Sequence, residues 1–293
     1  MYLSDRGCHG RAGVTRISYV VSAYKLPAQL ERLLRRLSAP GVFFAVHVDR
    51  KTRRAVYDEM VARTRDLDVV FLPRHVSHWG GFGHVRATLK GIDHIVSESV
   101  PFDYAILLTG QDYPLRSPAA IAAFLADSGE RSFMNHWRLP FSPWGKRGGL
   151  ERIEDWHVIT FRRLHLALPV RRRLPLGLVP YGGGAYWCLA KELVDYVHGF
   201  VHANPAYVRF FEHAFVPDEL FFQTITMNSP LRHSVENENL RYIDWSREPA
   251  PAVLGQNDMA ALLSTPKLFA RKFDERIDSA VLDLLDAHID GQN

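Results

Sequence analysis

The chain has 293 residues, of which 47% are hydrophobic, and this is enough for one large α/β domain or two small domains. Its 36 lysines and arginines against 32 acidic residues give a net charge of +4. This mild basicity is not that of a dedicated nucleic-acid-binding protein, and it suits a protein that handles anionic ligands. No apolar run approaches the roughly 20 residues that a membrane-spanning helix needs.

The first 16 residues are polar and lack the apolar centre of a secretion signal. We therefore expect a loose leader over residues 1–16 and a single domain over residues 17–293. The two cysteines, Cys8 and Cys188, form neither a disulfide framework nor a metal-ligand spacing. This usage predicts a reducing compartment, the cytoplasm.

Short apolar runs alternate with amphipathic segments in the first part of the chain. Strands are predicted at 17–21, 42–48, 69–72 and 104–108, and helices at 26–37, 54–65 and 88–97. The alternation predicts an α/β fold with a mainly parallel sheet and flanking helices. Ligands of such sheets bind at the carboxyl ends of the strands, where Ser22, Asp49 and Asp112 lie. Residues 17–130 are therefore the predicted nucleotide-binding half.

The remaining residues, 131–293, are the predicted acceptor-binding and catalytic half. A loop-built insertion rich in Trp, Arg and Gly is expected over 133–156, and a basic segment over 162–173. A glycine turn leads into a predicted strand at 182–189, and another strand is predicted at 240–245. Helices are predicted at 191–201, from Pro217 onward, at 258–263 and at 279–289.

A divalent ion on a diphosphate is usually held by an Asp-x-Asp triplet directly after a central strand. The triplet in this chain, Asp66 to Asp68, comes before a strand, and Asp112 stands alone where the triplet is expected. No cluster of His, Glu and Asp suggests another metal site, so no metal is expected. Arg271 and Lys272, between two phenylalanines, can supply fixed positive charge in place of a metal.

Pro217, Asp218 and Glu219 stand directly before an apolar run. Proline favours the first position of a helix, and acidic residues suit its first turn. The same rigid start would aim the carboxylate of Glu219 in a fixed direction. The pattern is thus consistent with a plain helix start and with a catalytic carboxylate.

Seven short motifs follow one another in a recognisable order: HVDRK at 47–51, WGG at 79–81, QDYPL at 111–115, GAYW at 184–187, PDELFF at 217–222, LRYIDW at 240–245 and LFARKFD at 268–274. The ordered set resembles the core-2/I-branching β-1,6-N-acetylglucosaminyltransferases and the related peptide O-xylosyltransferases, glycosyltransferase family 14. The resemblance spans about residues 17 to 275.

This resemblance implies a GT-A-like, Rossmann-related fold, a UDP-sugar donor, inversion at the anomeric carbon and no metal requirement. The Glu of the family's Pro-Asp-Glu motif is its catalytic base, which corresponds to Glu219, with Asp218 as a capping or site-shaping residue. The matching donor-binding residues are Val21, Ser22, Asp49, Arg271 and Lys272, to which Asp112 is added by its position. The expected acceptor contacts are Arg152, Trp187 and, as a sugar-stacking aromatic, Trp245.

The expected function is transfer of N-acetylglucosamine from a UDP-sugar to an acceptor hydroxyl with formation of a β-linkage. UDP-xylose is the alternative donor, and a non-catalytic sugar-nucleotide-binding module is the competing class. The acceptor is a carbohydrate, a natural product, a lipid-linked sugar or a protein. The arginines at 162, 163 and 171–173, with leucines between them, suggest peripheral contact with an anionic membrane; a solvated basic loop is the alternative.

Overall fold

The computed structural model describes residues 14–159, 165–168, 170–246 and 250–291. In this part of the chain a sheet of seven strands has the order β12-β6-β11-β4-β1-β2-β3. These strands are β1 (Ile17–Ala23), β2 (Val42–Val48), β3 (Val69–Phe71), β4 (Tyr104–Thr109), β6 (Ser132–Met134), β11 (Trp187–Ala190) and β12 (Val235–Glu236). β1 to β4 are parallel, and β11 is antiparallel to both of its neighbours.

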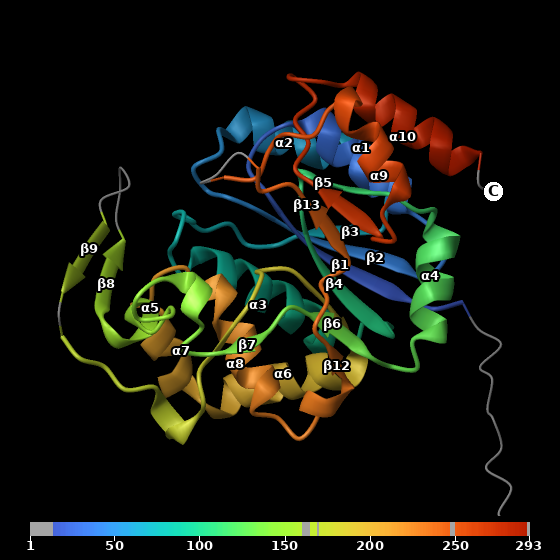
Figure 1. Cartoon of the computed structure of the whole chain (residues 1–293). Coiled ribbons are helices and arrows are strands. Elements are labelled where there is room, and N and C mark those ends of the chain that lie inside the picture. Colours follow the sequence, from blue (N-terminus) through green and yellow to red (C-terminus); the bar gives the residue numbers. More distant parts are fainter. Residues whose placement is uncertain (1–13, 160–164, 169, 247–249, 292–293) are drawn as a thin grey trace, which may run out of the picture.

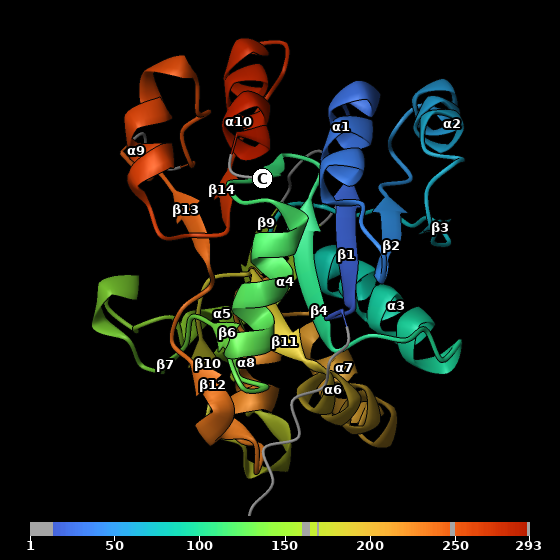
Figure 2. The same cartoon turned by 90° about the vertical axis from the view of Figure 1, so that its right-hand side faces the viewer.

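Helices cover both faces of this sheet (Figure 1; Figure 2). On one face lie α1 (Pro27–Leu37), α2 (Arg54–Arg63), α4 (Pro118–Asp127), α9 (Met259–Ser264) and α10 (Ala280–Asp290). On the other face lie α3 (Gly83–Ser97), α6 (Lys191–Ala203), α7 (Pro205–Phe211) and α8 (Phe221–Met227). The predicted mixed α/β architecture with a mainly parallel sheet is confirmed.

The strand sequences explain this arrangement, because a parallel sheet covered on both faces needs apolar side chains in both directions. Tyr19 and Val21 of β1 pack into the core that α1 and α10 cover. Val20 packs into the opposite core, beneath α3. In α1, leucines 30, 33, 34 and 37 share one face and are fully buried, as their spacing predicts.

A smaller sheet joins distant segments of the chain. Its strand order is β13 (Arg241–Ile243), β14 (Phe269–Arg271) and β5 (Asp112–Pro114). In its register Arg271 lies opposite Asp112. The carboxyl end of β4 is thereby attached to the segment that carries Arg271 and Lys272.

Three short elements build the region on the side of α3, α7 and α8. These are the ladder of β7 (Trp137–Arg138) with β10 (Tyr181–Gly182), the helix α5 (Glu151–Glu154) and the hairpin of β8 (Trp156–Ile159) with β9 (His165–Leu168). The hairpin projects from the side of the molecule in Figure 1. The predicted loop-built insertion at 133–156 therefore contains several short elements.

Several predicted boundaries were wrong. The strand predicted to follow the glycine turn within 182–189 is β11, Trp187–Ala190, whereas the strand predicted at 240–245 is shortened to Arg241–Ile243 and the helix predicted at 88–97 begins at Gly83. Pro217 begins a single 3-10 turn, Pro217–Glu219, and α8 starts at Phe221. The left-handed backbone of Val216 and the non-helical Leu220 separate this turn from α8.

The large sheet takes strands from both sides of residue 130, since β6, β11 and β12 extend the sheet begun by β1 to β4. Residues 1–13 of the predicted leader, including Cys8, lie outside the described residues, and Arg16 is hydrogen-bonded to Asp103. No helix within the described residues is long and apolar enough to cross a membrane. Cys188 is buried in β11, and burial raises the pKa of its thiol to about 12.

Candidate active site

The loops after β1, β2 and β4 are fastened to one another at the carboxyl edge of the sheet. The Gly110 amide donates to the Ser22 carbonyl at 2.9 Å, and the Asp49 amide donates to the Ala23 carbonyl at 3.0 Å. Ser22 and Asp49 therefore lie on neighbouring strands at the same edge, where a parallel sheet binds its ligands.

Asp49 is held firmly at this edge. Its carboxylate accepts a hydrogen bond of 2.8 Å from the Lys51 amide and lies 3.3 Å from the Lys51 ammonium. Arg74 donates to the backbone carbonyls of Asp49 and Thr52 at 2.9 and 2.6 Å. These bonds fix the turn after β2, which the sequence predicted to face the donor.

Val21 is placed differently from its prediction. Its side chain is fully buried in the core beneath α1, while the neighbouring Ser22 is half-buried at the edge. A direct contact between the Val21 side chain and a nucleotide is therefore excluded in this structure. Alternation along β1 assigns Val21 to the core.

Asp112 is also fully buried, so its predicted contact with the donor is not supported. One carboxylate oxygen accepts from the Thr109 amide and hydroxyl at 2.5 and 2.6 Å. The other lies 4.0 Å from Nε of Arg271. Asp112 thus acts on Arg271, which it holds in place by charge, and not on a ligand.

A group of cations lies at this end of β14. Burial, together with Arg271 and Lys25, lowers the pKa of Lys272, while Asp274 opposes this effect. Lys25 pairs with Asp274 at 2.6 Å. The sequence analysis missed Lys25, although it follows directly after β1. Since burial is the main cause of the lowered pKa and the neighbouring cations add to it, an anion bound beside Lys272 would favour its charged form.

The GAYW motif presents a different aromatic residue from the one predicted. Trp187 is fully buried and packs against Phe222 at 5.7 Å between ring centroids, so its predicted acceptor contact is wrong. Tyr186 is partly buried, and the Arg271 guanidinium stacks on its ring at 4.3 Å.

Glu219, the predicted base, is paired with Arg152, which the sequence analysis assigned to the same site as an acceptor contact. Nη1 of Arg152 donates to Oε2 of Glu219 at 2.6 Å. The Arg152 guanidinium also lies 3.9 Å from the centroid of the Trp144 ring. In addition, the Arg152 carbonyl accepts from the Phe215 amide at 2.8 Å. Arg152 therefore holds both the side chain of Glu219 and the backbone that leads to it.

The electrostatics of this turn favour a usable base. Burial and the neighbouring Asp218 raise the pKa of Glu219, and Arg152 lowers it by a smaller amount. Burial also raises the pKa of Asp218, which His84 opposes. Within the described residues Oδ1 of Asp218 is buried without a hydrogen-bond partner. A general base works best when its pKa approaches the working pH, so the raised pKa suits Glu219.

Glycines bring the backbone close to the Glu219 turn from two sides. The Gly183 amide donates to the Glu219 carbonyl at 2.9 Å, and a Cβ at Gly183 would lie 1.7 Å from the Asn135 carbonyl oxygen. On the other side, the Gly80 carbonyl accepts from the Val216 amide at 2.8 Å. Gly183 has no room for any side chain, which explains this part of the glycine run.

The WGG motif therefore belongs to the site, although the sequence analysis assigned no role to its residues. Gly80 has φ of +74°, and a Cβ there would meet the Phe215 ring at 2.9 Å. The neighbouring Trp79 is 75% exposed and makes an edge contact with Phe215. This places an open aromatic face beside the turn that carries Glu219.

The remaining predicted residues lie further out. Trp245 follows β13 and is 51% exposed, so it is open to a ligand. The loop after it returns to Lys272, where the Leu254 amide donates to the Lys272 carbonyl at 2.9 Å. Asp66 of the Asp-x-Asp triplet binds Arg35 and lies in the connection before β3, which is where the sequence placed it.

The structure describes part of the basic segment for which the sequence suggested contact with a membrane. Arg162, Arg163 and Leu164 lie outside the described residues. Arg172 is half-buried, donating to backbone carbonyls and stacking on Phe210 at 3.9 Å. Arg171 is paired with Glu154 at 2.9 Å. Arg172 is thus committed within the protein, whereas the Arg171 side chain is 74% exposed and Leu166, Leu168 and Val170 are also exposed.

A hollow between α1 and α10 is a competing location for an anionic ligand, because three arginines line it. Arg32 and Arg36 bind the Asp286 carboxylate, and Arg35 binds Asp66. The positive charge there is already neutralised.

A family model and several known proteins match this chain. The family model described as "Branch: Core-2/I-Branching enzyme" matches residues 17–264. Xylosyltransferase 2 of Rattus norvegicus is 29% identical over 300 residues, which cover 95% of this chain and 34% of the rat protein. A xylosyltransferase of Ciona intestinalis is 24% identical over 295 residues, with 94% and 34% covered. The chain thus spans about a third of the length of these relatives.

One similar solved structure is 4-diphosphocytidyl-2C-methyl-D-erythritol synthase from Anaerococcus prevotii DSM 20548. It has a TM-score of 0.34 and 11% sequence identity to this chain. The match covers 66% of this chain and 76% of that one.

Proposed function

We propose, on the premise that this chain belongs to the core-2/I-branching enzyme family, that it is an inverting, UDP-sugar-dependent glycosyltransferase with a GT-A-like fold. It would transfer one sugar to an acceptor hydroxyl and form a β-linkage. Glu219 is the proposed base, and Arg271 with Lys272 is the proposed diphosphate site.

One observation carries this proposal: a short glycine-rich segment connects the proposed base to the proposed cations. The Gly183 amide binds the Glu219 carbonyl, and Tyr186, three residues later, stacks against Arg271. The proposed base and Arg271 thus both contact the segment 183–186, and Lys272 follows Arg271 directly in the chain. In-line displacement needs these two groups on opposite sides of the anomeric carbon.

The proposed reaction forms one bond and breaks one. The acceptor oxygen attacks the anomeric carbon, its proton passes to the Glu219 carboxylate, and the bond from the anomeric carbon to the diphosphate oxygen breaks. The electron pair leaves with UDP, whose developing charge Arg271 and Lys272 stabilise. A single carboxylate is sufficient for inversion, since no covalent intermediate forms.

Asp218 is assigned a supporting role. When it is ionised, the Asp218 carboxylate adds negative potential beside Glu219. This potential raises the pKa of Glu219 and strengthens it as a base.

Two donors remain as candidates. The sequence motifs led us to expect N-acetylglucosamine, whereas the relatives' names favour xylose. Either donor would use the same base and the same diphosphate contacts. Trp79 lies beside the turn that carries the proposed base, and Tyr186 lies against Arg271. We propose that these two aromatic side chains limit the space available to the donor sugar.

The test is UDP release by the purified protein from a panel of UDP-sugars, with and without simple sugar acceptors. We expect turnover with UDP-xylose or UDP-N-acetylglucosamine, loss of turnover in Glu219→Gln, and wild-type turnover in the control Glu212→Gln, whose carboxylate pairs with Arg86 on the surface. If wild type binds UDP but the whole panel gives no turnover, the protein is a binding module. If Glu219→Gln is as active as wild type, the assignment of the base is wrong.

A further inference from the structure

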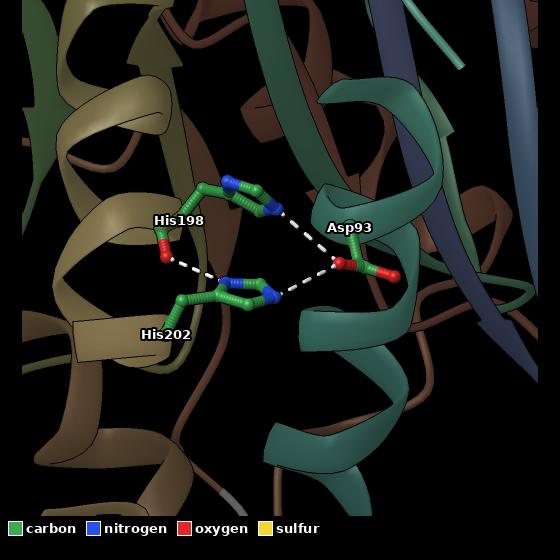
Figure 3. A group of neighbouring side chains, drawn as sticks. All are labelled: Asp93, His198 and His202. Atoms are coloured by element: carbon green, nitrogen blue, oxygen red, sulfur yellow. Dashed lines mark hydrogen bonds and ion pairs between the residues drawn. The ribbon is translucent and has the colours of Figure 1, made fainter. Parts of the chain in front are cut away.

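A second cluster of ligating side chains lies outside the proposed active site. Asp93 on α3 faces His198 and His202 on α6 (Figure 3). The potential ligand atoms of all three side chains lie within 4.8 Å of one another. His198 and His202 are four residues apart, which places both rings on one face of α6. The sequence analysis missed this cluster, since Asp93 is far away in sequence.

The distances fit a metal ion. Oδ1 of Asp93 lies 3.2 Å from Nε2 of His198 and 3.4 Å from Nε2 of His202. Zinc binds histidine nitrogen and carboxylate oxygen at about 2.0–2.2 Å in tetrahedral geometry, so neighbouring ligand atoms are roughly 3.3 Å apart. The carboxylate oxygen is therefore already at the separation from each ring that a shared tetrahedral ion requires.

The hydrogen bond on the far side of His202 adds an independent argument. Nδ1 of His202 lies 2.9 Å from the His198 carbonyl oxygen, which can only accept, so Nδ1 carries the proton. In neutral His202, Nε2 then presents a lone pair toward the Asp93 carboxylate. Two acceptors at 3.4 Å repel unless a second proton or a cation lies between them. Metal-bound histidines commonly have this kind of Nδ1–H to carbonyl bond.

We propose that Asp93, His198 and His202 form a binding site for a divalent cation of the zinc class. The three side chains supply one oxygen and two nitrogen ligands, and water completes the coordination. Neutral imidazole favours zinc and its neighbours in the first transition row over magnesium or calcium. The partial exposure of Asp93 and His202 leaves the site open to ions from solution.

The role of the proposed metal site follows from its position between α3 and α6. Asp93 lies nine residues after His84, about 13 Å along α3, and His84 is close enough to Asp218 to affect its pKa. The ion would therefore link α3 to α6 at the end of α3 remote from Glu219. It would stabilise the packing of these helices and take no part in sugar transfer.

The test uses the full chain after treatment with EDTA and removal of the chelator. Titration with Zn²⁺ alone, followed by calorimetry, should show one tight site per chain. Asp93→Asn and His202→Ala should each weaken it by about a hundredfold or more, since even outer-shell changes at metal sites cost about 10–100-fold. The control His233→Ala removes an exposed histidine outside the cluster and should leave the affinity unchanged.

Two further measurements separate this site from chance zinc binding. Co²⁺ should give the visible absorption of a tetrahedral nitrogen and oxygen site, and Asp93→Asn should abolish it. Free Zn²⁺ at a hundred times its Kd should shift the folding equilibrium by about a hundredfold and raise Tm in wild type but not in Asp93→Asn. Equal zinc affinity in wild type and both variants, or no binding at millimolar zinc, overturns the proposal. Neither result depends on turnover.

Discussion

Replacing Arg152 by Met is the sharpest test of the proposed chemistry. Arg152 contacts Glu219 at 2.6 Å through Nη1 and stacks on Trp144 at 3.9 Å. Methionine keeps an unbranched apolar side chain against the Trp144 ring but removes the charge. The substitution therefore isolates the effect of the cation on the proposed base.

The free energy lost when Arg152 is replaced depends on how far the Arg152–Glu219 ion pair is buried. Two unit charges about 4 Å apart attract by about 4 kcal/mol at an effective dielectric constant of 20. The Arg152 and Glu219 side chains are 19% and 30% exposed, so water screens part of this attraction. The expected loss lies between the 0.2–1 kcal/mol typical of exposed pairs and the roughly 3–5 kcal/mol of buried ones, at about 2 kcal/mol.

The direction of the expected change in the pH–rate profile follows from the proposed role of Glu219 as a base. A base must be deprotonated, so the rate falls as the pH falls through the pKa of Glu219, which the fold already raises. Loss of Arg152 raises that pKa further and moves the acid limb of the kcat/KM profile to higher pH. On this limb about 2 kcal/mol corresponds to roughly a thirtyfold lower rate, and the difference should narrow toward alkaline pH.

The assay is initial-rate UDP release across a pH series, with the donor that the screen identifies. Arg147→Met is the matched control, because Arg147 pairs with Glu154 and Asp155 of the same segment and does not contact Glu219. Its pH profile should equal that of wild type. An equal loss for Arg152→Met at every pH, with the acid limb unmoved, would refute the electrostatic role and leave only a structural one.

Four other outcomes are expected. Glu219→Gln should lower kcat by about 10²–10⁴ with little change in UDP affinity measured by calorimetry, and a parallel loss of UDP binding would contradict its role as a base. Lys272→Met should weaken UDP binding by about ten- to a hundredfold, as expected for a charge-assisted hydrogen bond, whereas Lys267→Met, which removes a partner of Glu238, should not. Turnover should persist in excess EDTA, and complete loss restored by Mn²⁺ would overturn the use of cations in place of a metal. Trp187→Ala should lower the free energy of unfolding by about 3–5 kcal/mol in denaturant titrations, and a change below 1 kcal/mol would contradict its placement in the core.

The sequence predicted the four parallel strands β1 to β4 well, because each of them is short and apolar on both faces. It placed Ser22, Asp49 and Asp112 at the correct edge, since ladder direction follows from the alternation of strands and helices. It did not predict that Asp112 is buried. That burial depends on β14, which comes from 157 positions further along the chain and covers β5 in the smaller sheet.

Trp187 shows a second limit. Period-2 alternation predicts that Tyr186 and Trp187 face opposite sides, but not which side holds the site. The choice is made by the pairing of β11 between β4 and β6, which directs Trp187 toward Phe222 of α8. These pairings join β11 to segments about 80 and about 50 residues earlier in the chain and have no local signal.

The Glu219 carboxylate is fixed in direction, but for a structural reason other than the one that the sequence suggested. The pattern of Pro217 and the acidic residues suggested that a helix start fixes the carboxylate. The turn is instead a single 3-10 turn set apart from α8, so a helix dipole contributes little to its placement. Its rigidity comes from tertiary bonds, to the Gly80 carbonyl before it and from the Gly183 amide after it.

These bonds give the scattered motifs a common physical purpose. WGG supplies the carbonyl that holds Val216, the glycine run supplies the amide that holds Glu219, and GAYW places Tyr186 against Arg271. Gly183 admits no larger residue because a Cβ would overlap the Asn135 carbonyl. Gly183→Ala should therefore disturb both the base and the cations, although it contacts no substrate atom in the proposed mechanism. Such a coupled loss, in kcat and in UDP affinity together, is what distinguishes a shared backbone support from two independent sites.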